Sequence, residues 1–146
     1  MGAFLVLITL IYLSIQIRNN TKEVKSENAH RITDSFNQLN LLVASNERLA
    51  ALWPKGMADY DDLSDPQKIS FGFMQLAAFR IYDSLYYQIQ RGTGNEQLWE
   101  GELNTIRWLF SSPGMRAWWI QQQFAFSPGF QKYIDNIVCE QAENNA

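Results

Sequence analysis

An uninterrupted apolar segment near the N-terminus constrains the fold of this chain more than any other feature. It runs from Gly2 to Ile17 as GAFLVLITLIYLSIQI, and the first charged residue is Arg18. A helix of this length spans about 24 Å, slightly less than the roughly 30 Å of bilayer hydrocarbon. Because apolar side chains occur on every face of such a helix, the segment predicts a transmembrane anchor over residues 1–18.

Two other interpretations of this segment are weaker. A cleaved signal peptide needs a basic region before the apolar run and small residues at the cleavage site, and neither is present. A buried core helix of a soluble protein has a similar length, but it is seldom apolar all round. Because the segment is shorter than the bilayer hydrocarbon, the anchor is expected to be truncated at its N-terminus, with Gln16 and Arg18 extending to the membrane interface.

Basic residues after the segment predict its orientation. No Lys or Arg precedes the apolar run, whereas four follow it within a short distance, diluted by Glu23 and Glu27. By the positive-inside rule, the C-terminal domain is expected in the cytoplasm. The four basic residues are Arg18, Lys22, Lys25 and Arg31.

Composition predicts a folded domain and argues against several kinds of partner. Hydrophobic residues make up 47% of the chain and aromatic residues 14%, enough for a substantial core. The net charge of −3 argues against a nucleic-acid partner, which usually requires a basic face. The single cysteine, Cys139, and single histidine, His30, argue against an internal disulfide or a zinc site, and no cofactor is expected.

The rest of the chain predicts helices and no strands. Apolar residues recur at helical spacing over 20–44, 65–91 and 95–111, and a short helix over 46–53 is expected to end before Pro54. The polar stretch 57–65 lacks the spacing of a calcium loop and predicts a solvated connection. The predicted fold is all-α: the transmembrane helix continues into a bundle of about four to five helices over 19–140, followed by a disordered tail over 141–146.

The tripeptide Ser-Pro-Gly occurs twice, at 112–114 and 127–129. A phosphate-binding loop needs further glycines and a Lys, Ser or Thr at its end, which neither copy has. A capping serine before proline at the first helical position is typical of a helix start. Both copies are therefore predicted to begin helices.

Several segments resemble a family of small bacterial proteins over nearly the whole chain. These segments are LITLIYLSIQIRNNT, DSLYYQ, LWEGEL, SSPGMRAWW and FSPGF. The resemblance implies one N-terminal membrane helix followed by a helical domain, and hence a single-pass protein of the bacterial inner membrane. It implies no particular activity.

Charged residues in the most apolar helix form one candidate site. Arg80 and Asp83 lie beside Tyr86 and Tyr87, and a buried charge requires a partner. Either they form a structural polar network, or they line a pocket for a small anionic or aromatic ligand, or this face is exposed. Further members of the network are expected to be Arg107 and Arg116.

Two adjacent tryptophans form a second candidate site. Trp118 and Trp119 point about 100° apart on a helix, so one of them can enter the core while the other needs another environment. Packing of both in a wide core, a position at the membrane interface and an exposed anchor for a partner protein all remain open. The stripe Ser26, His30 and Asp34 matches a catalytic triad in residue types, but it lacks an oxyanion hole and a closed pocket.

These features favour a membrane-tethered helical interaction module without catalytic activity. Its partners are expected to be the lipid bilayer, through residues 2–17, and another membrane or cytoplasmic protein. The alternative is a small-molecule-binding or sensory helical domain that uses the polar pocket around Arg80 and Asp83. An enzyme whose site the sequence does not reveal is a third, weaker option.

Overall fold

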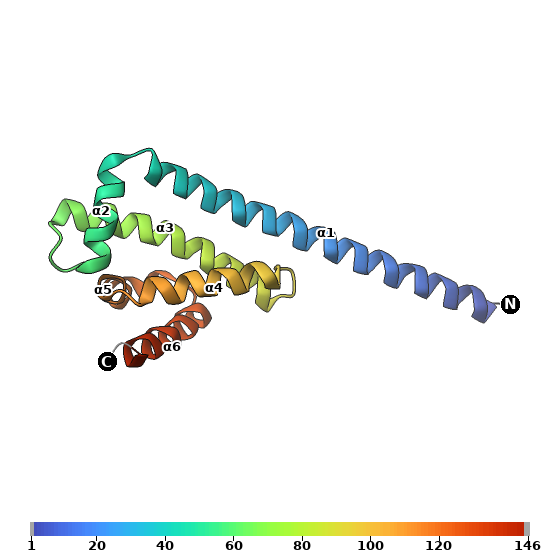
Figure 1. Cartoon of the computed structure of the whole chain (residues 1–146). Helices are drawn as coiled ribbons and strands as arrows, with labels where there is room; N and C mark the ends of the chain where they lie inside the picture. Colours follow the sequence, from blue (N-terminus) through green and yellow to red (C-terminus); the bar gives the residue numbers. More distant parts are fainter. Residues whose placement is uncertain (1, 145–146) are drawn as a thin grey trace.

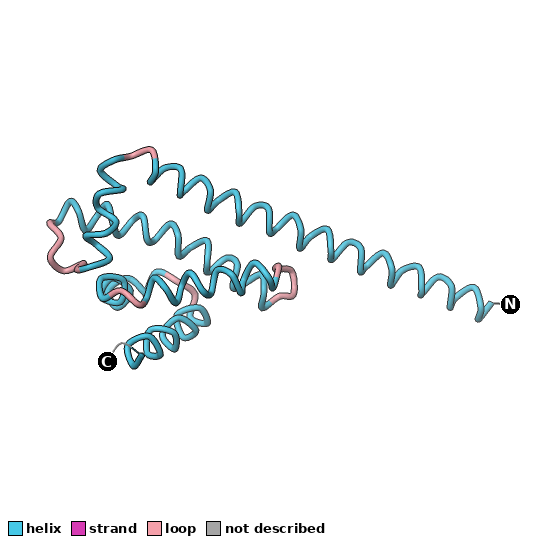
Figure 2. Tube along the Cα trace, viewed as in Figure 1, coloured by secondary structure: helices cyan, strands magenta, loops and turns pink. Residues whose placement is uncertain are grey.

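The structure is a computed structural model that describes residues 2–144. Within that range the chain forms six α-helices and one short 3-10 helix. No strand occurs within that range, and a long N-terminal helix leads into a helical bundle, so the predicted all-α fold is confirmed (Figures 1 and 2). The elements are α1 (Gly2–Ala44), α2 (Glu47–Ala58), α3 (Asp65–Gln90), α4 (Glu96–Phe110), α5 (Pro113–Gln122), η1 (Gln123–Ala125) and α6 (Pro128–Asn144).

The apolar segment and the first helix of the bundle form one continuous helix, α1. Its N-terminal part projects beyond every other helix, while its C-terminal part lies along the bundle (Figure 1). The bundle begins near Asn28, whose Nδ2 donates to the backbone oxygen of Thr93 at 3.0 Å. Ile32 is the only buried residue of α1. The predicted continuation of the apolar N-terminal helix into the domain is therefore confirmed.

The predicted end of the second helix at Trp53 is wrong. The Asn46 side chain caps α2, but the helix continues through Pro54 to Ala58. Proline leaves the carbonyl of Ala50 without its helical partner, and the exposure of both residues lets water replace that bond. Leu52 and Gly56 are buried, so packing holds the last turn in place.

Local signals set the other helix starts correctly. The backbone N–H of Ser64 donates to Gln67 Oε1 at 3.0 Å, as in a capping box at the start of α3. Both Ser-Pro-Gly segments begin helices, with Pro113 as the first residue of α5 and Pro128 as the first residue of α6. The second start has an additional cap from a distant helix, which is described below.

The core surrounds α3 and is rich in aromatic rings. Phe79 of α3 is fully buried and contacts rings from α3, α4, α5 and the segment before α6. On the other side, α2 crosses α5 so closely that a Cβ added at Gly114 would lie 1.9 Å from the backbone oxygen of Gly56. The largest fully buried side chains are Trp118, Trp119, Phe71, Phe79, Phe110, Phe130, Leu85, Ile106, Met115, Ile134 and Gln75.

The C-terminal helix is longer than predicted. Residues 141–144, assigned from their polarity to a disordered tail, belong to α6, which ends at Asn144. Buried Ile134 and Ile137 fix the preceding turns against the core, and the helix extends from them. Residues 145–146 of the predicted tail lie outside the described residues.

Candidate functional site

The predicted polar network around Arg80 and Asp83 does not form. Arg80 is exposed, and among residues 2–144 it makes no ion pair within 4.0 Å. Asp83 instead caps α6: its carboxylate accepts from the Ser127 backbone N–H at 3.0 Å and from the Ser127 hydroxyl at 2.6 Å. The helix face carrying Arg80 points to solvent, so no buried charge needed a partner there.

The two other arginines assigned to this network also have local roles. Arg107 is exposed and donates to Asn104 Oδ1 on its own helix at 3.4 Å. Arg116 donates to the backbone oxygens of Phe110 and Ser111, at 2.7 and 2.9 Å. These carbonyls end α4, where a cation is favoured by the helix dipole. Arg116 therefore stabilises the α4–α5 corner.

The two tyrosines of the predicted pocket face different environments. Tyr86 packs in an aromatic cluster with Trp99, Phe130 and Tyr133, at centroid distances of 6.0, 5.7 and 5.3 Å. Tyr87 is 57% exposed and is paired with Arg91, not with Arg80. The predicted residues therefore do not converge on one ligand site.

The predicted interaction surface at Trp118 and Trp119 is also wrong, because both side chains are buried, at 0% and 1% exposure. Packing of both in the core was the correct alternative, since α5 is covered on two sides. Trp118 lies 5.1 Å from Phe79, and Trp119 stacks on Phe126 at 5.3 Å with 20° between the ring planes. The Trp119 Nε1–H donates to Asp135 Oδ1 at 2.8 Å.

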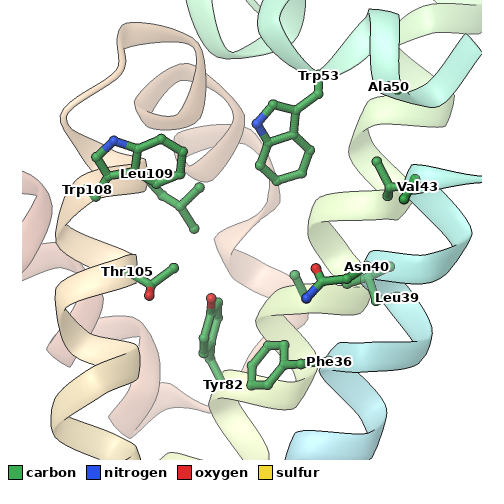
Figure 3. Close-up of a pocket in the computed structure, with 12 residues that line it drawn as sticks. Phe36, Leu39, Asn40, Val43, Ala50, Trp53, Tyr82, Thr105, Trp108 and Leu109 are labelled. Atoms are coloured by element: carbon green, nitrogen blue, oxygen red, sulfur yellow. The ribbon is translucent and has the colours of Figure 1, made fainter. Parts of the chain in front are cut away.

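An apolar groove lies instead between α1 and α4, with α3 as its floor and α2 at one end (Figure 3). Its volume is about 460 Å³, within the range of small-molecule sites. We call it the α1–α4 groove. It is lined by Phe36, Leu39, Asn40, Val43 and Ala44 of α1, Ala50 and Trp53 of α2, Ala78 and Tyr82 of α3, and Thr105, Trp108 and Leu109 of α4.

The packing of the four helices produces this groove. Both α1 and α4 pack on α3, but α1 and α4 do not pack closely on each other, which leaves the space above α3 open. Ala78 is a small side chain on the floor, and Tyr82 stands next to Phe36 with their ring centroids 4.9 Å apart. Trp108 is 60% exposed on the opposite wall. The site is therefore preformed and open on one side.

Few polar groups face the groove, and they lie near one end of it. The Tyr82 hydroxyl and the Asn40 amide point into the space in Figure 3. Tyr82 also interacts with Glu102, which lies one turn before Thr105 on the same face of α4. Burial raises the pKa of Glu102, opposed by a hydrogen bond with Tyr82, and burial followed by the charge of Glu102 raises the pKa of Tyr82.

Glu102 is a partly buried carboxylate without a cationic partner. Among residues 2–144, no Lys, Arg or His nitrogen lies within 4.0 Å of its oxygens. Removing a carboxylate from water costs free energy unless a cation or several donors compensate for the charge. Glu102 does not itself line the groove, but it interacts with Tyr82, which does. An uncompensated negative charge therefore lies next to this end of the groove.

The sequence contained a signal for this groove that the prediction did not use. Trp108 lies outside the inner stripe of its helix, which includes Trp99, Leu103 and Ile106. A tryptophan on the polar side of an amphipathic helix needs an explanation, as was argued above for Trp118 and Trp119. The residues that face Trp108 across the groove, Phe36 and Trp53, could not be inferred from the sequence, because they lie 50 or more positions away from Trp108 in the chain.

Within residues 2–144, one helix is long and apolar enough to cross a membrane, as judged by length and composition alone. This helix is α1, and none of its apolar stretch is buried. From Phe4 to Ile17 its large hydrophobic side chains are 48% to 67% exposed. That exposure argues against a core helix, which would bury the same residues.

No family model, no curated protein and no solved structure matches this chain. The resemblance to a bacterial family therefore stays a prediction. Among residues 2–144, no group of three or more His, Cys, Asp or Glu side chains is placed to hold a metal ion. The geometry of the α1–α4 groove is thus the main basis for a functional argument.

Proposed function

We propose that this chain is a single-pass membrane protein whose helical domain binds a small apolar molecule in the α1–α4 groove, without catalysing a reaction. The groove itself carries the proposal, because it is preformed, has a suitable volume and combines apolar walls with a few polar groups at one end. We further propose that α1 anchors the domain in the inner membrane of a bacterium. The basic residues after the apolar segment favour a cytoplasmic location for the domain.

The length of α1 supports a ligand that arrives from the aqueous phase. Phe36 lies eighteen residues after Arg18 on one continuous helix, which corresponds to about 27 Å. With α1 crossing the bilayer, the groove would stand well beyond the lipid headgroups. A lipid that remains in the membrane could not reach it.

The five tryptophans of the chain provide a site-resolved test. We would record the indole N–H signals of the full chain in an uncharged detergent while adding 3-phenyl-1-propanol, a neutral apolar probe. Two indoles line the groove, those of Trp53 and Trp108, and their signals are expected to shift with a Kd of about 1 mM. The signals of buried Trp99, Trp118 and Trp119 are expected to remain in place.

A pair of variants on α4 controls this test. Thr105→Phe would fill the groove, whereas Asn104→Phe adds the same ring at the neighbouring exposed position, which does not line it. The first variant is expected to abolish the shifts and the second to preserve them. Shifts that persist in Thr105→Phe, or no shift of Trp53 and Trp108 in the unmodified chain, would refute ligand binding in the groove.

A partner helix is a second candidate occupant, because the groove is open along one side and Trp108 is 60% exposed there. In this case the protein would be the interaction module expected from the sequence, with its contact surface at the groove and not at Trp118 and Trp119. Affinity purification from gently solubilised membranes would test it. A protein recovered in near-equal amount with Asn104→Phe, but lost with Thr105→Phe, would favour this candidate over the small molecule.

A further inference from the structure

The polar end of the α1–α4 groove offers a hydrogen-bond acceptor to a ligand. The Tyr82 side chain is only 4% exposed, yet its hydroxyl lies at the surface of the groove (Figure 3). Burial and the charge of Glu102 raise the pKa of Tyr82, so the phenol stays protonated, and an ionised carboxylate attracts the phenolic proton. The lone pairs of the Tyr82 oxygen therefore remain for a donor in the groove.

The charge of Glu102 adds a second reason to expect a cation. This carboxylate is partly buried and has no cationic partner within 4.0 Å among residues 2–144, as described above. A positively charged ligand beside Tyr82 would supply the missing countercharge in a site partly shielded from water. An anionic ligand in this groove would be repelled by the same charge.

The aromatic walls contribute to the same selectivity. Phe36 packs against Tyr82 at this end, and Trp53 and Trp108 lie farther along the groove. Aromatic faces attract organic cations, and tryptophan does so most strongly. The walls also offer a dry surface to the hydrocarbon part of a ligand.

We propose that the groove binds an arylalkyl primary amine, whose ammonium group donates to the Tyr82 hydroxyl oxygen next to Glu102 while its hydrocarbon part lies between the aromatic walls. This inference rests on the proposed function, since it specifies the ligand of the same groove. Asn40 is a second acceptor for the ammonium group, because its side-chain amide points into the groove from α1 (Figure 3). The ligand class is a free organic amine and not a lysine of a partner protein.

Three probes of similar size would test the charge preference. The full chain in an uncharged detergent would be titrated at pH 7 with 3-phenylpropylamine, 3-phenyl-1-propanol and 3-phenylpropanoate, following the indole signals of Trp53 and Trp108. The ammonium probe is expected to bind about tenfold more tightly than the alcohol, and the carboxylate most weakly. In Glu102→Gln the preference for the amine is expected to disappear while the affinity for the alcohol stays the same.

A matched variant separates a specific role of Glu102 from a general effect of charge. Glu100→Gln removes the same charge from an exposed position on the same helix and is expected to keep the preference. A preference that survives in Glu102→Gln, or equal affinity of the unmodified chain for the three probes, would overturn the amine inference but leave the ligand-binding groove intact. Failure of all three probes to bind would refute the proposed function as well.

Discussion

The two Ser-Pro-Gly segments allow one prediction with opposite outcomes at equivalent positions. Gly114 and Gly129 are each the second residue of a helix. A Cβ at Gly114 would lie 1.9 Å from the Gly56 oxygen and 2.6 Å from the Met57 oxygen, both backbone atoms. A Cβ at Gly129 would meet only the Tyr86 ring, at an ordinary 3.6 Å. Gly114→Ala is therefore expected to destabilise the protein, and Gly129→Ala is not.

The magnitude follows from the geometry of the crossing. Backbone atoms cannot rotate away, so α2 and α5 would have to separate by about 1.5 Å to restore a normal contact. Overpacking of this kind costs about 3 kcal/mol or more, and the higher helix propensity of alanine offsets about 1 kcal/mol at most. We expect Gly114→Ala to lower the free energy of unfolding by at least about 2 kcal/mol, or the Tm by about 8 °C.

Thermal unfolding of the full chain in detergent, followed by near-ultraviolet circular dichroism of the tryptophans, would measure both variants. Gly129→Ala is expected to raise the Tm by up to about 4 °C, because only the propensity effect remains. Equal Tm values for the two variants would refute the argument, since it depends on the tight crossing at Gly114. A stable Gly114→Ala would mean that α2 and α5 lie farther apart.

Three further predictions concern buried or partly buried polar groups. Glu102→Gln is expected to raise the Tm at pH 7, because the pKa of Glu102 is raised in the folded state and its ionised form therefore destabilises that state above this pKa. The gain in Tm should vanish below pH 4.5, the ordinary pKa, where Glu102 is protonated in both the folded and the unfolded state. A lower Tm of the variant at pH 7 would contradict this. Asp83→Ala is expected to lower the free energy of unfolding in urea by about 1 kcal/mol through loss of the α6 cap, and to leave the probe affinities of the groove unchanged. A change in those affinities would support the ligand pocket that the sequence analysis placed at Asp83. Gln75→Met is expected to stabilise the protein by about 1 kcal/mol or more, because the fully buried Gln75 amide has no hydrogen-bond partner among the described residues. Destabilisation of this variant in urea unfolding would instead indicate an internal water bound to Gln75.

Local sequence features determined the helices of this protein. The apolar run up to Ile17 and the two Ser-Pro-Gly starts each depend on residues close together in the chain, and each was predicted correctly as a structural element. The Ser64 to Gln67 cap is equally local. The end of α2 was not, since Pro54 is a strong local signal that the packing of Leu52 and Gly56 overrides.

Only the tertiary structure decided which side chains are exposed and where a ligand could bind. Trp118 and Trp119 point in different directions, yet both are buried because α5 is covered on two sides. Arg80 lies in the central helix but on its open face. The α1–α4 groove combines side chains from four helices, whose relative placement depends on long-range packing such as the contact between Gly56 and Gly114. Helical periodicity tells which residues share a face, but the neighbours of that face are set by packing across the whole domain.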